Sequence, residues 1–228
     1  GAARWYSSQG LGEGNISLLF ILNALYDATP ETVVVIDEPE LSLHPQAVRR
    51  LGVVLARFAS DRQITIFTHS PALVSWDAIA NGAEVARVYK RGHDSAIAQA
   101  DRAVLAEISK LRGSWNNPHV IGLDAKETLF LEDGLIVLEG QDDAALLPRV
   151  AELVGVELGG SVYGWGAGGE GNIEKVLALL KSLDFARVAA VFDNIVPEKV
   201  ERVRRAFPGY LVTTIPAADV RTKRAESA

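Results

Sequence analysis

Short apolar runs rich in β-branched residues alternate with helix-length stretches along most of the chain. The first run covers residues 32–37 and the second covers residues 63–67. Between them lies a stretch whose apolar residues fall on one side of a helix. Runs of this length and composition are typical of strands buried on both faces, so the order strand, helix, strand predicts a parallel-sheet unit.

A third apolar run, residues 85–90, ends at the polar, turn-rich residues 91–94. A helical pattern follows, and residues 113–118 interrupt it with Gly, Asn and Pro. We place the domain boundary between these two breaks. The expected organisation is a first part at residues 1–95, a helical linker at 96–132 and a second domain at 133–228.

The second domain repeats the alternation of strand and helix with regular spacing. In its middle helix Ile173, Val176 and Leu180 lie three and four positions apart, as a face that packs on a sheet requires. We predict a compact βαβ domain with a mostly parallel sheet. The expected strands are 135–138, 161–165, 188–192 and 210–215, and the expected helices are 142–154, 173–183 and 198–207.

Composition limits the class of protein and the kind of site. The 228 residues, 48% of them hydrophobic, suffice for two modest cores and contain no apolar run of membrane-spanning length, so we expect a cytoplasmic protein without a membrane partner. The chain has no Cys, which leaves Asp, Glu and His as metal ligands. The net charge of −6 counts against a chain-wide basic face for DNA, although nuclease sites are locally acidic until metal binds.

Two carboxylates, Asp37 and Glu38, stand where the first predicted strand ends. Parallel sheets bind ligands at that edge. Phosphoryl transfer needs one acid to hold Mg²⁺ and another to polarise the attacking water, and these residues are placed for the two tasks. An acidic strand end also arises by chance, so the interpretation depends on neighbouring motifs.

The neighbouring motifs occur in a fixed order. A Ser- and Gly-rich loop containing Ser8 and Gly10 runs into an apolar helix upstream, and its N–H groups could receive a phosphate. Residues 41–45 follow the first predicted strand, and His69 follows the second. Singly these are a Gly-rich turn and a core His, but together they resemble the signature loop, Walker B strand, D-loop and switch-histidine loop of ABC-type ATPases.

That resemblance implies contacts with ATP and Mg²⁺ through five positions. No GxxxxGK[ST] phosphate loop occurs in the sequence. We therefore expect ATP binding and hydrolysis only in the presence of the N-terminal half of such a nucleotide domain. The implied contact residues are Ser8, Gly10, Asp37, Glu38 and His69.

A second acidic group follows the strands of the second domain. Glu139 closes one apolar strand before Gly140, and Asp142 and Asp143 begin the next helix. Asp193 stands at the matching place on a later strand. Carboxylates at the C-terminal ends of two parallel strands can converge on a metal and support phosphodiester chemistry. The acids at the helix start could instead serve only the helix dipole, which is the favoured interpretation of Asp142.

This second pattern resembles the Toprim fold, a Mg²⁺-binding domain of topoisomerases, primases and some nucleases. An ABC-type ATPase followed by a Toprim domain resembles the OLD (overcoming lysogenization defect) family of ATP-dependent endonucleases, and the resemblance spans essentially the whole chain. It implies a Mg²⁺- or Mn²⁺-dependent nuclease that acts on DNA, with a dimeric ATPase core, in phage defence or DNA repair. A helicase or another defence protein is a possible partner.

The resemblance also assigns roles within the second domain. It makes Glu139 a metal ligand and possible acid or base, Asp143 the second acid, and Asp193 the first acid of an Asp-x-Asp pair. Ile195 stands where the family pattern places another Asp, so one metal site is weakened or completed elsewhere. The resemblance makes Lys223 the residue that stabilises charge on the scissile phosphate, whereas the residues alone fit a solvated basic tail equally well. Substitute ligands would be Asn194, Glu198 or Asp219.

Two functions remain. The first is a metal-dependent DNA endonuclease coupled to an ATPase, with Glu38, Glu139, Asp143, Asp193 and Lys223 as catalytic residues. The alternative is a non-catalytic, ATP-gated module that binds DNA or recruits a partner through a degenerate Toprim domain, and the departure from the family pattern favours it. A DNA-repair ATPase alone does not explain the second half of the chain.

Overall fold

The computed structural model describes residues 12–111, 123–193 and 197–216. Two compact units divide the chain, Gly1–Ser75 and Trp76–Ala228. This division falls earlier than the boundary after residue 95 that we expected from the sequence. The segment between the two positions belongs to the second unit.

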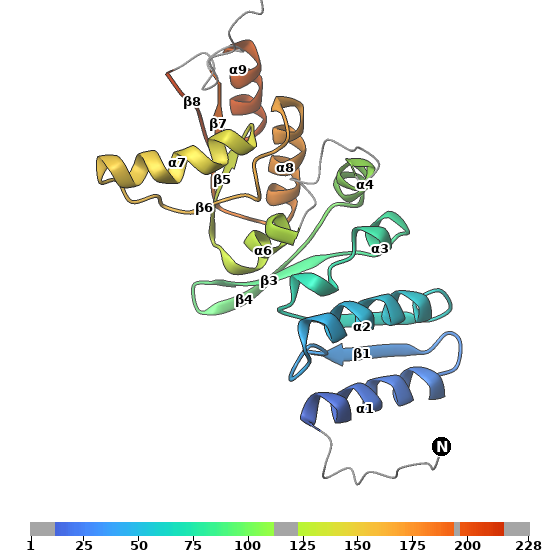
Figure 1. The fold of residues 1–228 in the computed structure, drawn as a ribbon. Helices are drawn as coiled ribbons and strands as arrows, with labels where there is room; N and C mark the ends of the chain where they lie inside the picture. The colour runs from blue at the N-terminus through green and yellow to red at the C-terminus, as the bar shows by residue number, and fades with distance from the viewer. Residues whose placement is uncertain (1–11, 112–122, 194–196, 217–228) are drawn as a thin grey trace, which may run out of the picture. The chain divides into compact units, whose positions relative to one another are not determined.

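The first unit is built from a parallel pair of strands and the helices that pack on it (Figure 1). In this pair β1 lies beside β2, with Val33 opposite Gln63 and Asp37 opposite Phe67. Helix α2 connects the two strands, and it begins where the His44 side chain accepts a hydrogen bond from the backbone of Gln46. The elements are α1 (Glu13–Asp27), β1 (Val33–Asp37), α2 (Pro45–Phe58), β2 (Gln63–Phe67) and the 3-10 helix η2 (Pro71–Leu73).

Only one face of this strand pair is covered within the described residues. Leu25, Leu51 and Leu55 of the helices are buried against the alternate strand residues Val34, Ile36, Ile64 and Ile66. On the opposite face Val33 and Val35 are 58% and 61% exposed. The prediction that β1 is buried on both faces is therefore wrong within the first unit, since Val33 and Val35 are more than half exposed.

The second unit contains a four-stranded sheet in the order β6-β5-β7-β8, and every neighbouring pair is parallel. The predicted α/β architecture with a parallel sheet is confirmed, although β6 is only two residues long. The elements before the sheet are α3 (Trp76–Ala80), β3 (Ala86–Arg91), β4 (Asp94–Gln99), α4 (Arg102–Lys110) and α6 (Leu123–Leu131). Those of the sheet and its helices are β5 (Gly134–Leu138), α7 (Gln141–Val154), β6 (Ser161–Val162), α8 (Glu170–Ser182), β7 (Arg187–Phe192), α9 (Pro197–Ala206) and β8 (Leu211–Thr214).

The strand order of the sheet reverses at β5. From β5 the chain moves outward to β6 and then crosses back to β7 and β8. Connections between parallel strands are right-handed almost without exception, and with this strand order they place α7 on one face of the sheet and α8 and α9 on the other. Arg202 of α9 bonds Glu174 of α8 at 2.5 Å, which agrees with a shared face. The reversal occurs between β5 and β7, and doubly wound sheets bind ligands at the carboxyl ends of the strands at such a point.

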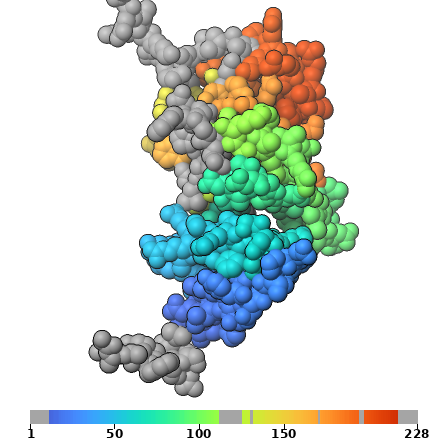
Figure 2. All heavy atoms as spheres, turned by 90° about the vertical axis from the view of Figure 1, so that its right-hand side faces the viewer, coloured from blue at the N-terminus to red at the C-terminus, as the bar shows by residue number. Residues whose placement is uncertain are grey.

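Helix α8 packs on the sheet through an apolar face. Its residues Ile173, Val176 and Leu180 are fully buried, as their spacing predicted. The helix contacts β5 and β7 and also packs on α4, whose light green atoms adjoin the orange ones of the same unit in Figure 2. Among the described residues no helix has both the length and the apolar character that a bilayer crossing requires.

Strands β3 and β4 form an antiparallel hairpin that the sequence analysis predicted only in part. The polar break expected at residues 91–94 is the hairpin turn, because Arg91 pairs with Asp94 across Gly92 and His93. Gly92 has a φ of 65°, a conformation that glycine adopts at little cost. The strand predicted at residues 85–90 therefore ends as expected, but the chain then returns beside it as a second strand, β4, which the sequence did not predict.

The hairpin is fastened to the turn before β7 through Asp184. Tyr89 and Arg91 both donate hydrogen bonds to its carboxylate. The hydrogen bond from Tyr89, followed by that from Arg91, holds the pKa of Asp184 below its usual value. A lowered carboxyl pKa in the folded state contributes stability above the unfolded-state pKa of about 3.9, and this contribution is lost as the pH falls through the folded-state value.

Asp184→Asn should therefore lower the free energy of unfolding at pH 7 but progressively less as the pH falls below about 4. Denaturant unfolding at a series of pH values measures the difference between parent and variant. Asp94→Asn, at the exposed hairpin turn, is the matched control and should follow the parent throughout. A difference for Asp184→Asn that stays constant from pH 7 to pH 3 would contradict the assigned role of this carboxylate.

Candidate functional site

The carboxyl ends of β1 and β2 bring together the first group of predicted residues. Asp37 is the last residue of β1, and the N–H of Glu38 donates to the carbonyl of Phe67 at 2.8 Å. His69 follows β2, and its Nε2 lies 3.7 Å from Oε1 of Glu38. Both side chains of this pair are exposed, so a ligand can reach them.

Glu38 has a φ of 45°, a left-handed conformation that is uncommon for a residue with a side chain. Such backbone strain gathers at ligand-binding and catalytic positions. The structure thus places Asp37, Glu38 and His69 at one edge of the strand pair. Ser8 and Gly10, the other predicted nucleotide contacts, lie outside the described residues.

The start of α1 is packed tightly against the turn that follows β1. A Cβ on Gly14 would lie 2.1 Å from the carbonyl oxygen of Ser42, so only glycine fits there. The Ser42 hydroxyl also donates to the Glu13 carboxylate at 3.5 Å. The end of the predicted signature loop is therefore fixed beside the predicted D-loop.

Glu40 is a polar residue of this edge that the sequence analysis did not single out. Its Oε1 accepts hydrogen bonds from the Thr68 hydroxyl and from the backbone N–H of His69, both at 2.7 Å. Its Oε2 is shielded from solvent and has no hydrogen-bond partner among the described residues. No local sequence signal indicates these contacts, because the partners lie 28 and 29 positions away along the chain.

The second group of predicted residues lies at the carboxyl ends of β5 and β7, where the strand order of the four-stranded sheet reverses. Glu139 directly follows β5 and Asp193 directly follows β7. Because Leu138 pairs with Val191, Glu139 stands level with Phe192, and Asp193 comes one residue later. Neighbouring strands are about 4.8 Å apart, so the structure brings these two acids to the same rim.

The environments of the three predicted acids differ. Asp193 is 8% exposed and is the one charged residue that is buried among those described. Glu139 is half-buried. Asp143 accepts a hydrogen bond from the Gly140 backbone at 3.1 Å and so caps the start of α7. Asp143 thus has a structural task in addition to any contact with a ligand.

The glycine-rich loop before α8 completes the rim. The N–H of Ala167 donates to the carbonyl of Leu138 at 2.7 Å, and the N–H of Gly169 donates to the backbone carbonyl of Glu139 at 2.9 Å. Gly166 has a φ of 84°, and a Cβ there would lie 2.5 Å from the carbonyl oxygen of Gly140. The loop is therefore packed along the end of β5 and is not a free surface turn.

The donor atoms of this rim fit a hard cation. Buried and half-buried carboxylates on adjacent strands, with no thiolate in the chain, are the ligands that Mg²⁺ and Mn²⁺ prefer. No group of three or more His, Asp or Glu that could hold a metal is found within the described residues. The remaining positions raised by the sequence analysis, Asn194, Ile195, Asp219 and Lys223, lie outside those residues.

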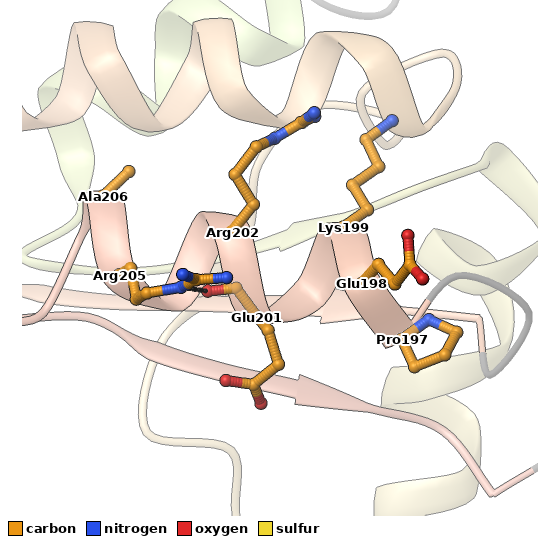
Figure 3. A pocket seen from close by; sticks show the side chains of 7 residues that line it. All are labelled: Pro197, Glu198, Lys199, Glu201, Arg202, Arg205 and Ala206. Atoms are coloured by element: carbon orange, nitrogen blue, oxygen red, sulfur yellow. Dashed lines mark hydrogen bonds between the residues drawn. The ribbon is translucent and has the colours of Figure 1, made fainter.

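A hollow along α9 lies on the segment that follows Asp193 (Figure 3). Lys199 and Arg202 extend from one side of the helix, whereas Glu198 and Glu201 extend from another (Figure 3). Arg202 pairs with Glu174 of α8. Carboxylates therefore compensate part of the positive charge, and the hollow by itself does not indicate a nucleic-acid site.

Comparison with known proteins gives relatives for parts of the chain. Residues 1–75 match the family described as "AAA domain, putative AbiEii toxin, Type IV TA system". An OLD nuclease of Thermus scotoductus is 28% identical over 174 residues, which is 72% of this chain and 31% of the relative. The chain therefore spans about a third of the length of that nuclease.

A solved structure from work on the ATP-driven dimerization and DNA-stimulated activation of SMC ATPases is also similar. Its identity is 16% and its TM-score is 0.34, with 46% of this chain and 65% of the other covered. An ATPase-type domain is thus matched at the N-terminus, and a weak similarity to a nuclease extends over most of the chain.

Proposed function

We propose that this chain is part of a metal-dependent DNA endonuclease that is coupled to an ABC-type ATPase. The observation that carries the proposal is the position of Glu139 and Asp193 after adjacent parallel strands, at the point where the strand order reverses. Ligand sites of doubly wound sheets form at this point. The similarity to an OLD nuclease supports the same activity.

In this proposal the Toprim-like domain, residues 133–228, carries the hydrolytic site. Glu139 and Asp193 hold Mg²⁺ or Mn²⁺, with Asp143 as a further acid, and Lys223 stabilises charge on the scissile phosphate. When bound, the metal would polarise the phosphate and lower the pKa of a bound water. Glu139 is half-buried, and in this proposal it also accepts the proton of the attacking water.

The proposed ATPase part lies within residues 1–75, and residues 76–132 connect it along the chain to this domain. Asp37 would hold Mg²⁺, Glu38 would orient the attacking water and His69 would contact the terminal phosphate of ATP. Ser8 and Gly10 would contact the nucleotide of a second copy in a homodimer. The proposed setting is cytoplasmic, in phage defence or DNA repair, where a helicase or another defence protein could be a partner.

A second candidate function is a non-catalytic, ATP-gated module that binds DNA or recruits a partner. Two observations favour it. Ile195 cannot ligate a metal, and Asp143 already caps α7. If the rim binds no metal, the sheet would serve only as a surface whose accessibility the ATPase controls.

Cleavage of supercoiled plasmid separates the two candidates. The endonuclease proposal predicts nicked or linear plasmid with Mg²⁺ or Mn²⁺ and none after EDTA is added, because the carboxylates cannot replace the charge of the cation. Agarose gels over a range of protein concentrations measure the conversion. Intact plasmid at every concentration, together with a retarded protein–DNA band, would favour the module.

A further inference from the structure

The edge that carries Glu38 and His69 depends on a carboxylate that none of the predicted motifs includes. After the N–H of Glu38 bonds the carbonyl of Phe67, no further backbone bond between β1 and β2 is found among the described residues. The chain then turns at Pro39, and Glu40 reaches back to the residues that follow β2. Its carboxylate links the two segments beyond the point where the backbone hydrogen bonds between the strands end.

Two donors converge on one oxygen of this carboxylate. Oε1 of Glu40 accepts from the Thr68 hydroxyl and from the N–H of His69, both at 2.7 Å. The Thr68 hydroxyl oxygen in turn accepts from the N–H of Ser70 at 2.9 Å. The three residues that precede η2 are thereby held by a single side chain, through hydrogen bonds to a charged acceptor, which are the stronger kind.

We call the hydrogen bonds from Thr68 and His69 to Glu40 the Glu40 clamp. The clamp affects where the imidazole of His69 can lie. The backbone of His69 is fixed by Glu40, and the backbone of Glu38 by Phe67. Each side chain is exposed, and their contact at 3.7 Å is too long to hold either of them. The two backbones therefore set the positions from which these side chains extend, and so the range of distances over which they can meet.

We propose that Glu40 is a positioning residue that holds His69 beside Glu38 for the hydrolysis of ATP. This inference rests on the proposed function, because it concerns the same nucleotide site. Glu40 itself need not touch the nucleotide, since its Oε1 is engaged by protein donors and its Oε2 is buried.

The test uses a polypeptide that carries this chain together with a phosphate-binding loop. Glu40→Ala should lower kcat between about tenfold and about a hundredfold, the range expected for a small misplacement of a catalytic group, with KM within about twofold. Glu40→Gln keeps a carbonyl oxygen that can accept both hydrogen bonds, so it should stay within about threefold of the parent. Glu31→Gln, in the exposed turn before β1, is the matched control and should leave both constants unchanged.

A double-mutant cycle distinguishes positioning from general support of the fold. If Glu40 acts through the imidazole, Glu40→Ala should not lower kcat further in the His69→Ala background. An equal loss of kcat in both backgrounds would overturn the proposal. A Glu40→Ala protein that hydrolyses ATP like the parent would overturn it as well.

Hydrogen exchange of the His69 amide keeps this inference separable from the proposed function. The backbone amide of His69 should exchange at least tenfold faster in Glu40→Ala than in the parent, whereas in Glu40→Gln it should exchange at the parent's rate. If the parent polypeptide hydrolyses no ATP, the ATPase assignment fails while this measurement still decides whether the clamp exists. Equal exchange rates in the parent and both variants would overturn the clamp itself.

Discussion

Asp193→Asn is expected to slow metal-dependent DNA cleavage by at least about a hundredfold while the sheet stays folded. The amide has nearly the shape of the carboxylate but lacks the charge that attracts a divalent cation. Burial of a neutral amide at a site that is 8% exposed also costs less than burial of a charge. The rate of plasmid nicking in Mn²⁺ is the measurement, and Glu139→Gln should show a comparable loss.

Metal binding gives an independent measurement for the same variant. A ligand that binds only the folded state raises the melting temperature, so Mn²⁺ should stabilise the parent and have a much smaller effect on Asp193→Asn. Asp133→Asn is the matched control because Asp133 precedes β5, at the opposite end of the strand from Glu139, and its side chain is 88% exposed. Equal nicking rates for Asp193→Asn and the parent would contradict the assigned role, as would equal losses in Asp193→Asn and Asp133→Asn.

Gly166→Ala is expected to lower the free energy of unfolding by about 2 to 5 kcal/mol. Two costs add at this position. The φ of 84° disfavours any residue with a side chain, and the new Cβ would lie 2.5 Å from the carbonyl oxygen of Gly140. Because the obstacle is backbone, it cannot move aside without displacing Glu139, the preceding residue. Denaturant unfolding measures the loss, and cleavage should fall in the molecules that remain folded.

Gly171→Ala is the control for this substitution. Gly171 lies in the first turn of α8, where no atom comes within 4 Å of an added Cβ. Alanine is favoured over glycine in a helix, so this variant should match the parent or exceed its stability by up to about 1 kcal/mol. Similar unfolding midpoints for the two variants would show that the loop is not pressed against the rim as described.

Most helices and strands could be predicted because their apolar spacing is regular. In α8 the buried residues Ile173, Val176 and Leu180 repeat at intervals of three and four, and no competing pattern exists. Strand β4 was missed because Asp94–Gln99 contains a single large apolar residue, Ile97, which is 72% exposed. Its pairing with β3 depends on the turn at Gly92, and the polar residues of that turn predict only the end of a strand.

The uncovered face of β1 illustrates another limit of the sequence. Val33 and Val35 belong to an apolar run that predicts burial, yet both are more than half exposed. An apolar strand indicates that a cover is favourable, but not which segment or chain supplies it. For the same reason the pattern could not distinguish a strand with one covered face from one with two.

The candidate metal site was partly predictable, because carboxylates after buried strands meet at one edge of a parallel sheet. The sequence does not contain the strand order, so it could not predict that β5 and β7 are neighbours at the point of reversal. The capping contact of Asp143 and the clamp formed by Glu40 depend on backbone geometry that residue spacing does not encode. Whether Glu139, Asp143 and Asp193 hold a metal stays a prediction.

Diffraction from crystals soaked in Mn²⁺ tests the central claim most directly. The account predicts an anomalous peak at the carboxyl rim of β5 and β7, with an oxygen of Glu139 and an oxygen of Asp193 among its ligands. The peak should disappear in Asp193→Asn crystals grown under the same conditions. A map with no peak at this rim, or with the two carboxylates turned away from a shared ion, would contradict the proposed endonuclease site.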